Sequence, residues 1–231
     1  MLDDAKRVKP RRIRIMDIAI IGAGNVGRSL ATAFVRAGHD VTITSRDPED
    51  AGAAAAATGA TVADSNEAAA ASSSIVVLAV PFASAPDIAA EIRTEVDGKI
   101  VIDATNRMSF GANGPDIDTA TSNAEELAGL LPEASIVKAF NTLFASKQSD
   151  PITEGVRLDG YVAADDEAAR ATVLELVESI GLRPVDVGPL ARARQLEGLA
   201  FLNITLNIVN GGSWQSGWKL VGAPVPDSVA A

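Results

Sequence analysis

Residues 17–27 read D-I-A-I-I-G-A-G-N-V-G, a short apolar run followed by three spaced glycines. The apolar run is typical of a strand buried on both faces, and the glycines match the pattern G-x-G-x-x-G. The residues that follow place apolar side chains at helical spacing as far as Gly38, a residue type that commonly ends a helix. A strand, a glycine turn and a helix in this order predict a dinucleotide-binding unit; the alternative is a turn with a purely structural role.

Each glycine of this turn has a distinct expected role. Gly22 permits the tight turn, Gly24 lets the backbone approach a pyrophosphate, and Gly27 lets the helix pack closely against the strand. The unpaired amides at the start of the helix would supply the rest of an anion site. We therefore expect residues 22–27 to hold the pyrophosphate of a dinucleotide.

A second strand is expected at residues 41–44, and it runs into Thr44, Ser45 and Arg46. An NAD-binding fold keeps an Asp or Glu at this point, on the adenosine ribose. A carboxylate there would repel a 2′-phosphate, whereas two hydroxyls and a guanidinium offer it charge-assisted hydrogen bonds. The sequence therefore favours NADP(H). The alternative is that Asp47 binds the ribose while Arg46 is solvated.

The alternation of strands and helices continues to about residue 150 and then becomes mixed α+β. It predicts right-handed crossovers and a parallel sheet covered on both faces. We expect an α/β fold of the Rossmann type: a doubly wound, mostly parallel sheet with a small helical and α+β C-terminal portion. The expected units are a flexible basic extension at 1–15, an NADP-binding Rossmann domain at 16–150 and the small C-terminal portion at 151–231. The expected strands are 17–21, 41–44, 61–62, 75–80, 99–103, 135–140, 160–163 and 183–187; besides the helix that ends at Gly38, helices are expected at 47–58, 65–71, 85–96, 123–131, 166–180 and 190–210, and a loop at 106–122.

The ends of the later strands supply further residues to the same edge of the sheet. The segment Leu-Ala-Val-Pro at 78–81 ends the fourth strand where the strand order is expected to reverse, and ligands of doubly wound sheets bind at such a point. Asn106 follows the fifth strand and residues 139–141 end the sixth, so both would face the nicotinamide half; for Pro81 the alternative is a packing role alone. The residues expected to bind the cofactor are Gly22, Ala23, Gly24, Asn25, Val26, Gly27, Thr44, Ser45, Arg46, Ala79, Val80, Pro81, Asn106, Ala139, Phe140 and Asn141.

Composition restricts the partners and the compartment. The chain has 231 residues and a formal net charge of −10; residues 1–15 hold six basic and two acidic side chains, so the rest carries −14. A body this acidic disfavours nucleic acid as a partner. The absence of Cys excludes disulfides and a thiol nucleophile, and no apolar run approaches the ~20 residues of a membrane helix. We expect a soluble, cytoplasmic protein without a metal site.

Six segments together resemble the coenzyme F-420-dependent NADP reductase family over roughly residues 16–222. They are G-A-G-N-V-G (22–27), T-S-R (44–46), L-A-V-P (78–81), D-A-T-N (103–106), V-K-A-F-N-T (137–142) and G-L-R-P-V-D-V-G-P-L (181–190). The resemblance implies NADP(H) on the glycine turn and residues 44–46, a deazaflavin stacked on the nicotinamide, and a homodimer. It also places the acceptor site and the dimer contacts in residues 151–231. Some archaeal members have a His where this chain has Asn141, and the K-A-F-N version resembles the bacterial and ferric-reductase branch. A flavin therefore stays open as the alternative acceptor.

The chain is poor in groups that could protonate a substrate beside the nicotinamide. The single His, His39, precedes the second strand and is interpreted as structural, and the single Tyr, Tyr161, as a core residue of a strand. Hydride transfer between two planar redox rings needs little acid–base help; the protein has to stack the rings and exclude water. Lys138 is the exception, because it is a candidate acid for an imine or ketone; the alternative is a strand lysine whose head reaches solvent.

The expected function is therefore that of an NADP(H)-dependent oxidoreductase that passes hydride between NADPH and a deazaflavin or flavin. Asn141 and Lys138 are the candidate catalytic residues. Two alternatives stay open at this point: a small carbonyl or imine reductase that uses Lys138 as its acid, and an NADP-binding protein without turnover.

The last expected helix carries Asn203, Asn207 and Asn210 in one line on an otherwise apolar surface. Buried amides need partners, since an unpaired one costs ~1–3 kcal/mol. We expect this line to face either the ligand cleft or, preferably, a twin helix across a dimer interface. Trp214 and Trp218 are interpreted as the roof of the cleft or as dimer anchors.

Overall fold

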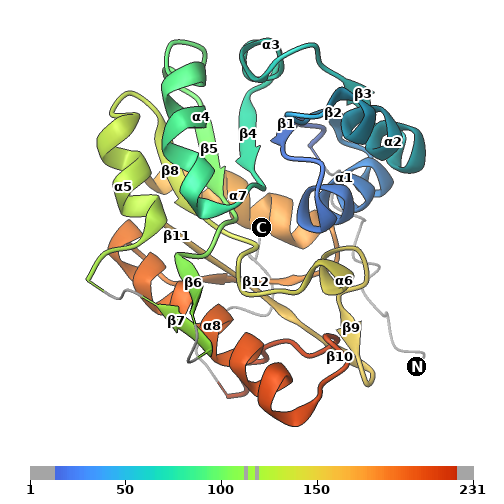
Figure 1. The fold of residues 1–231 in the computed structure, drawn as a ribbon, viewed down its shortest axis with the longest axis vertical. Helices are drawn as coiled ribbons and strands as arrows, with labels where there is room; N and C mark the ends of the chain where they lie inside the picture. Colours follow the sequence, from blue (N-terminus) through green and yellow to red (C-terminus); the bar gives the residue numbers. More distant parts are fainter. Residues whose placement is uncertain (1–13, 112–113, 118–119, 223–231) are drawn as a thin grey trace, which may run out of the picture.

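The computed structural model of the protein describes residues 14–111, 114–117 and 120–222. One eight-stranded sheet runs through it with helices on both faces (Figure 1). Of the basic extension expected at 1–15, only Arg14 and Ile15 lie within the described residues, so that expectation falls outside them.

The strand order of the sheet is β12-β11-β8-β5-β4-β1-β2-β3. Neighbouring strands are parallel except β8 and β11, which pair antiparallel. The chain steps from β1 outward to β3 and then returns on the other side of β1 as β4, so the strand order reverses there. The expected doubly wound, mostly parallel sheet is confirmed. The strands are β1 (Asp17–Ile21), β2 (Asp40–Thr44), β3 (Thr61–Val62), β4 (Ile75–Leu78), β5 (Ile100–Asp103), β8 (Ser135–Lys138), β11 (Asp159–Ala164) and β12 (Arg183–Asp186).

Helices cover the two faces of the sheet because successive strand side chains point to opposite sides. Ile18 and Ile20 of β1 pack with α1, α2 and α7, whereas Ala19 and Ile21 pack with α3, α4 and α5. Both faces of the central strands are therefore apolar, which is what their continuous apolar sequence predicts. The helices are α1 (Asn25–Ala37), α2 (Pro48–Thr58), α3 (Asn66–Ala71), α4 (Ala85–Ile92), α5 (Asn123–Leu130), α6 (Ala145–Gln148), α7 (Glu167–Ser179) and α8 (Ala193–Asn210), with 3-10 turns η1 (Phe82–Ser84) and η2 (Leu190–Arg192).

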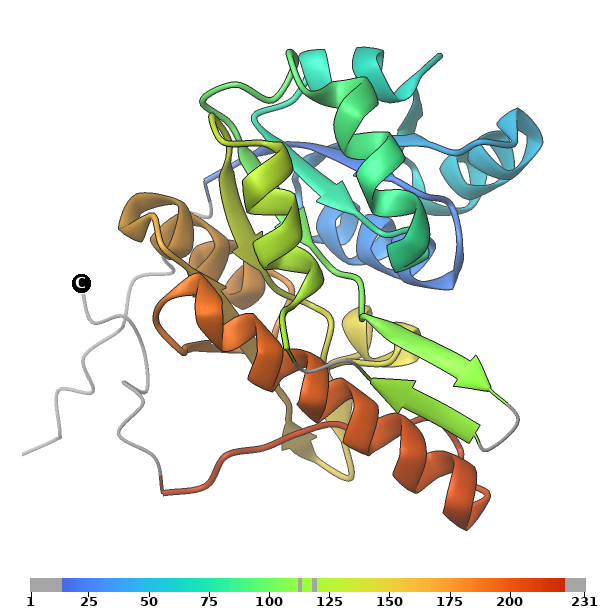
Figure 2. The ribbon, with the colours of Figure 1, turned by 60° about the vertical axis from the view of Figure 1, so that its left-hand side comes forward.

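The loop expected at residues 106–122 is wrong in part, because it contains an antiparallel hairpin of β6 (Met108–Gly111) and β7 (Gly114–Ile117). Figure 2 shows this hairpin beside α8, away from the main sheet. Each strand has four residues and one contains a proline, so neither carries a strong alternating pattern; the Asn-Gly pair at 113–114 was the available hairpin signal. A second small hairpin, β9 (Ile152–Thr153) with β10 (Val156–Arg157), and α6 also escaped the sequence pattern.

The C-terminal portion continues the same sheet across residue 150, since β11 pairs with β8 through Ala163 and Ala164. β11 in turn pairs with β12, and residues 214–222 return along its start. The carboxylate of Asp159, fully buried, anchors this returning segment: it accepts hydrogen bonds from the Leu220 N–H (2.7 Å), Lys219 (3.0 Å) and Arg183 (2.7 Å). Burial alone would raise the pKa of Asp159, but these donors outweigh it and lower the pKa.

The asparagine line on α8 faces neither a ligand cleft nor a twin helix at its two buried positions, and the expectation is wrong there. Asn207 donates to the Ser216 Oγ (2.8 Å) and accepts from the Trp214 N–H (3.0 Å), and Asn203 accepts from the same Ser216 hydroxyl (2.7 Å). The buried amides thus satisfy the backbone and hydroxyl groups of the segment that folds back on the helix, while Asn210 is exposed. Their partners were too close in sequence and too irregular in structure for a periodicity argument to find.

Among the described residues, no helix is both long enough and apolar enough to cross a membrane. The same residues include no group of three or more His, Cys, Asp or Glu side chains placed to hold a metal ion.

Candidate nucleotide-binding site

The glycine turn between β1 and α1 requires glycine at its first and last positions for the fold itself. Gly22 has φ +114°, and a Cβ on it would lie 2.4 Å from the carbonyl oxygen of Ala79. A Cβ on Gly27 would lie 1.8 Å from the carbonyl oxygen of Gly22. These two glycines therefore allow the close approach of turn, helix and neighbouring strand, and a structural role alone would explain them.

Gly24 is different, because no described residue crowds this position. Its φ of −72° is open to any residue, and a Cβ built on it meets no heavy atom within 4 Å. The residue is exposed at the mouth of the turn. An external group that must approach the backbone closely explains a glycine at this position. For the fold alone, glycine is a better N-cap than alanine but a poorer one than Ser, Asp or Asn.

The amino end of α1 leaves its first N–H groups available for an anion. Gly24 is the N-cap, it provides no side-chain cap, and the first turn contains no acidic residue. Four other helices have a side-chain cap, at Asp47, Ser65, Ser122 and Asp166, whereas α4 and α8 continue from 3-10 turns and also lack one. The start of a 13-residue helix without a cap offers both unpaired donors and the positive end of the helix dipole to a phosphate group.

The end of β2 presents the Ser45 hydroxyl and one uncommitted guanidinium, whereas Thr44 is buried (3% exposed). The Gly22 N–H donates to the Thr44 carbonyl (2.9 Å), which fixes the end of β2 beside the glycine turn. Ser45 is half-buried and Arg46 is exposed, and Arg46 makes no hydrogen bond or ion pair with the part of the chain that the structure describes. Asp47, the alternative ligand of a ribose, accepts the Glu49 N–H (2.9 Å) as the cap of α2.

Residues 79–81 lie against the other side of the glycine turn. The Ala79 N–H donates to the Ile21 carbonyl (2.9 Å), and the Ala79 carbonyl is the group that a side chain at Gly22 would strike. Val80 is half-buried and Pro81 is exposed, directly before η1. The expected strand 75–80 therefore stops at Leu78, because the chain leaves the sheet to border the turn.

Asn106 and Asn141 form a reciprocal amide pair where β5 and β8 end. The Asn106 Nδ2 donates to the backbone carbonyl of Asn141 (3.2 Å), and the Asn141 Nδ2 donates to the Asn106 Oδ1 (2.9 Å). This pairing fixes both amide orientations and leaves the Asn141 Oδ1 buried without a partner among the described residues. Phe140 adopts φ +64°, which turns the chain out of β8 at this point, and its ring packs edge-on against Phe34. Ala139 beside it is fully buried.

Lys138 is completely buried in a cluster of charges, so the alternative of a lysine whose head reaches solvent is wrong. Its Nζ donates to the Thr105 carbonyl (2.6 Å), the Glu197 Oε1 (2.7 Å) and the Asp103 Oδ2 (2.8 Å). An ammonium has three donors, and all three are engaged. The side chains of Asp103 and Glu197 are 0% and 1% exposed. The cluster fastens α8 to the ends of β5 and β8 and holds Thr105 directly before Asn106.

Glu197 is the main residue of this region that the sequence did not single out. Its carboxylate also accepts the Asn123 N–H (3.0 Å) and the Arg107 N–H (3.3 Å), so it joins α8 to the start of α5 and the segment after β5. The one available signal was an acidic residue among apolar neighbours of a helix, in Q-L-E-G-L-A. That signal names no partner, because Lys138 lies 59 residues away.

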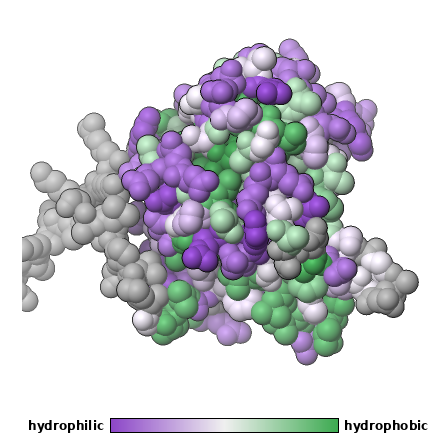
Figure 3. Space-filling model, turned by 90° about the vertical axis from the view of Figure 1, so that its left-hand side faces the viewer, coloured by the Kyte–Doolittle hydropathy of each residue, from purple (hydrophilic) through white to green (hydrophobic). Residues whose placement is uncertain are grey.

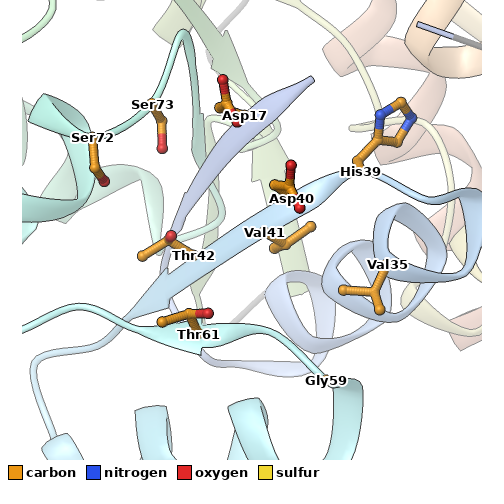
Figure 4. A pocket seen from close by; sticks show the side chains of 10 residues that line it. All are labelled: Asp17, Val35, His39, Asp40, Val41, Thr42, Gly59, Thr61, Ser72 and Ser73. Carbon is orange, nitrogen blue, oxygen red and sulfur yellow. The ribbon is translucent and has the colours of Figure 1, made fainter. Parts of the chain in front are cut away.

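His39 and Tyr161 are structural, as expected from the sequence. The His39 Nδ1 accepts the Met16 N–H (3.3 Å), its Nε2 pairs with the Ser179 Oγ (2.9 Å), and burial lowers its pKa while the charge of Asp40 opposes that shift. It borders a hollow of about 320 Å³ at the amino ends of β1 and β2, opposite the glycine turn (Figure 4). Burial, followed by the charge of Asp159, raises the pKa of Tyr161 to about 12.

Comparison with known proteins gives a consistent assignment. The model of the family described as NADP oxidoreductase, coenzyme F420-dependent, matches residues 17–107. The F420-dependent NADP reductase of Methanothermobacter thermautotrophicus is 36% identical over 215 residues, which cover 86% of this chain and 92% of the relative. A solved structure of a candidate F420-dependent NADP reductase from Arthrobacter sp. FB24 superposes with a TM-score of 0.80 at 29% identity, over 89% of this chain and 99% of that one.

A second group of relatives is longer than this chain. Metalloreductase STEAP3 of Rattus norvegicus is 33% identical over 184 residues, which cover 79% of this chain but 36% of the metalloreductase. The chain thus spans little more than a third of the length of the metalloreductases that it matches. The match over nearly the whole length of the archaeal reductase assigns the chain: it belongs to the F420-dependent NADP reductase family.

Proposed function

We propose that the chain binds NADP(H) along the carboxyl edge of the sheet and transfers hydride between NADPH and a deazaflavin or flavin. The single observation that carries the proposal is the combination at the glycine turn. Gly24 has open space around it and begins a helix without a side-chain cap, and Arg46 near it has a guanidinium without a partner among the described residues. Such a site suits a pyrophosphate with a further phosphate nearby.

The proposed roles follow the order of the strands along the edge. The backbone of residues 22–27 would hold the pyrophosphate, and Thr44, Ser45 and Arg46 the 2′-phosphate. Residues 79–81, Asn106 and residues 139–141 would border the redox half, with the unpaired Oδ1 of Asn141 suited to an N–H donor of a ligand. Neighbouring strands lie ~4.8 Å apart, so β2 to β8, which end at these two groups of residues, span ~19 Å, a distance that the ligand has to cover in an extended conformation.

NADPH supplies the hydride when it is bound, and the protein's own part is to place the rings and keep water out. Lys138 supports a reaction without a protein proton donor, because its three N–H donors already bond oxygen acceptors in a fully buried cluster. A reductase that uses Lys138 as its proton donor has no comparable observation in its favour. An NADP-binding protein without turnover would use the same nucleotide site, so only an experiment distinguishes it from a reductase.

Two measurements test the proposal in sequence. A fluorescence titration with NADPH and NADH should give tighter binding of NADPH, and Arg46→Glu should invert that preference, while Arg36→Glu on the far end of α1 should not. Stopped-flow mixing of NADPH with oxidised deazaflavin, and separately with a flavin, should then bleach the band of the true acceptor. NADPH binding without bleaching of any acceptor would support the non-catalytic protein instead.

The proposal extends to a homodimer in the cytoplasm, with acceptor site and dimer contacts in residues 151–231. Apolar side chains gather along the lower edge of the face in Figure 3. On α8, Leu202, Leu206 and Val209 are 47%, 47% and 75% exposed. Analytical ultracentrifugation should give a dimer for the wild type and a monomer for Val209→Glu, and fractionation of host cells would test the compartment.

A further inference from the structure

Arg28 reaches from α1 across the glycine turn to the start of α2. Its Nε donates to the Ala23 carbonyl (2.7 Å), and its Nη2 lies 3.2 Å from the Asp50 Oδ1. The two side chains are 41% and 60% exposed, so an ion pair of this kind contributes little to stability. The weak ion pair therefore leaves the guanidinium accessible to a further partner.

The guanidinium of Arg28 lies at the corner that would receive the adenosine ribose. The Gly22 N–H donates to the Thr44 carbonyl (2.9 Å), so the residue bonded to Arg28, Ala23, directly follows the point where the glycine turn meets the end of β2. On its other side, Asp50 belongs to the first turn of α2, three residues after the cap Asp47. Ser45 and Arg46 lie on the chain between these two anchor points.

The charges at this corner make a single arginine insufficient for a dianionic phosphate. Three carboxylates gather at the start of α2, namely Asp47, Glu49 and Asp50. With Arg46 alone opposite them, the corner would carry a net negative charge and repel a 2′-phosphate. Arg28 supplies the second cation, pairs with Asp50 and lowers the net charge of the corner from −2 to −1.

We propose that Arg28 is a second specificity-determining residue, which binds the 2′-phosphate of NADP(H) together with Arg46. The inference rests on the proposed function. A guanidinium has five N–H donors, and Arg28 uses two of them on Ala23 and Asp50; no other described residue takes the rest. Its backbone anchor at Ala23 fixes the planar group beside the turn, which limits the entropy lost when a phosphate binds.

The test compares the affinities of NADPH and NADH for four variants by fluorescence titration. Arg28→Met should weaken NADPH binding about tenfold to a hundredfold and NADH binding less than threefold, because only NADPH carries the extra phosphate. Arg36→Met is the matched control: it removes the same charge from the same helix, two turns further on, and should change neither affinity. Arg28→Lys should recover part of the preference, and Asp50→Asn should increase it.

The outcomes separate this inference from the proposed function. Tight NADPH binding by the wild type with equal losses of NADPH and NADH in Arg28→Met would overturn the role of Arg28, since the residue would then only hold the turn. A lower preference for NADPH in Asp50→Asn would also overturn it. Wild-type protein that binds neither nucleotide would overturn the proposed function itself, and the inference with it.

Discussion

Gly24→Ala should separate nucleotide binding from folding. The new methyl group meets no heavy atom within 4 Å, and φ −72° suits alanine. Alanine is a poorer N-cap than glycine, at a cost of about 0.5–1 kcal/mol, but it restricts the unfolded chain and regains about 0.4–1 kcal/mol. The two effects offset each other, so the melting temperature should stay within about 4 °C of the wild type.

The affinity for NADPH should nevertheless fall about tenfold to a hundredfold. The methyl group occupies the space through which a pyrophosphate approaches the backbone donors at the start of α1, and one lost charge-assisted hydrogen bond is worth about 1.5–3 kcal/mol. Fluorescence titration and thermal unfolding on the same samples measure both quantities. Gly52→Ala is the matched control, because Gly52 is an exposed glycine inside a helix and also has open space around it. This substitution should raise the melting temperature by about 2–4 °C and leave the affinity for NADPH unchanged. If Gly24→Ala binds NADPH as tightly as the wild type, the site assignment is refuted.

Two further predictions concern the charged interior and pH. Lys138→Met should lower the free energy of unfolding by about 3–5 kcal/mol in urea titrations, because it leaves Asp103 and Glu197 buried without a counter-charge. Adding Glu197→Gln should restore part of the loss. A loss below about 1 kcal/mol would contradict the buried cluster. Burial lowers the pKa of His39, so its neutral form is the one that the fold favours and the unfolded chain takes up the proton first. Stability should therefore be complete above the unfolded pKa of about 6.5 and decrease as pH falls below it, and His39→Gln should show a smaller decrease over pH 7 to 5.

Local patterns in the sequence were sufficient to predict most of the strands and helices of the sheet. The run 17–21, the glycines after it and the apolar strand at 75–78 each carry their information within a few residues, because side-chain period and turn chemistry are local properties. The ends of elements were predicted less well for the same reason. The strand expected at 135–140 ends at Lys138, because Phe140 turns the chain out of the sheet with a positive φ, and an apolar run does not predict such a turn.

Some residues of the candidate site could also be predicted from local sequence, and others could not. Glycines 22 and 27 and the hydroxyls and arginine at 44–46 could be predicted from the sequence, because the order of strand and turn fixes where they lie. The sequence could not predict that Gly24 is free of internal contacts, since that depends on what surrounds the turn. The same holds for Arg28, whose partner Asp50 lies 22 residues away on another helix.

The sequence by itself thus determined a doubly wound sheet, a glycine turn at its carboxyl edge and the kind of charge expected beside it. Only the tertiary structure decided that Lys138 is enclosed by Asp103 and Glu197 and that Asn203 and Asn207 hold the returning chain. The physical reason is that periodicity reports which side of an element faces the core, whereas a buried polar group is defined by the one partner that satisfies it. That partner is selected by packing between elements far apart in the chain, and no local pattern contains it.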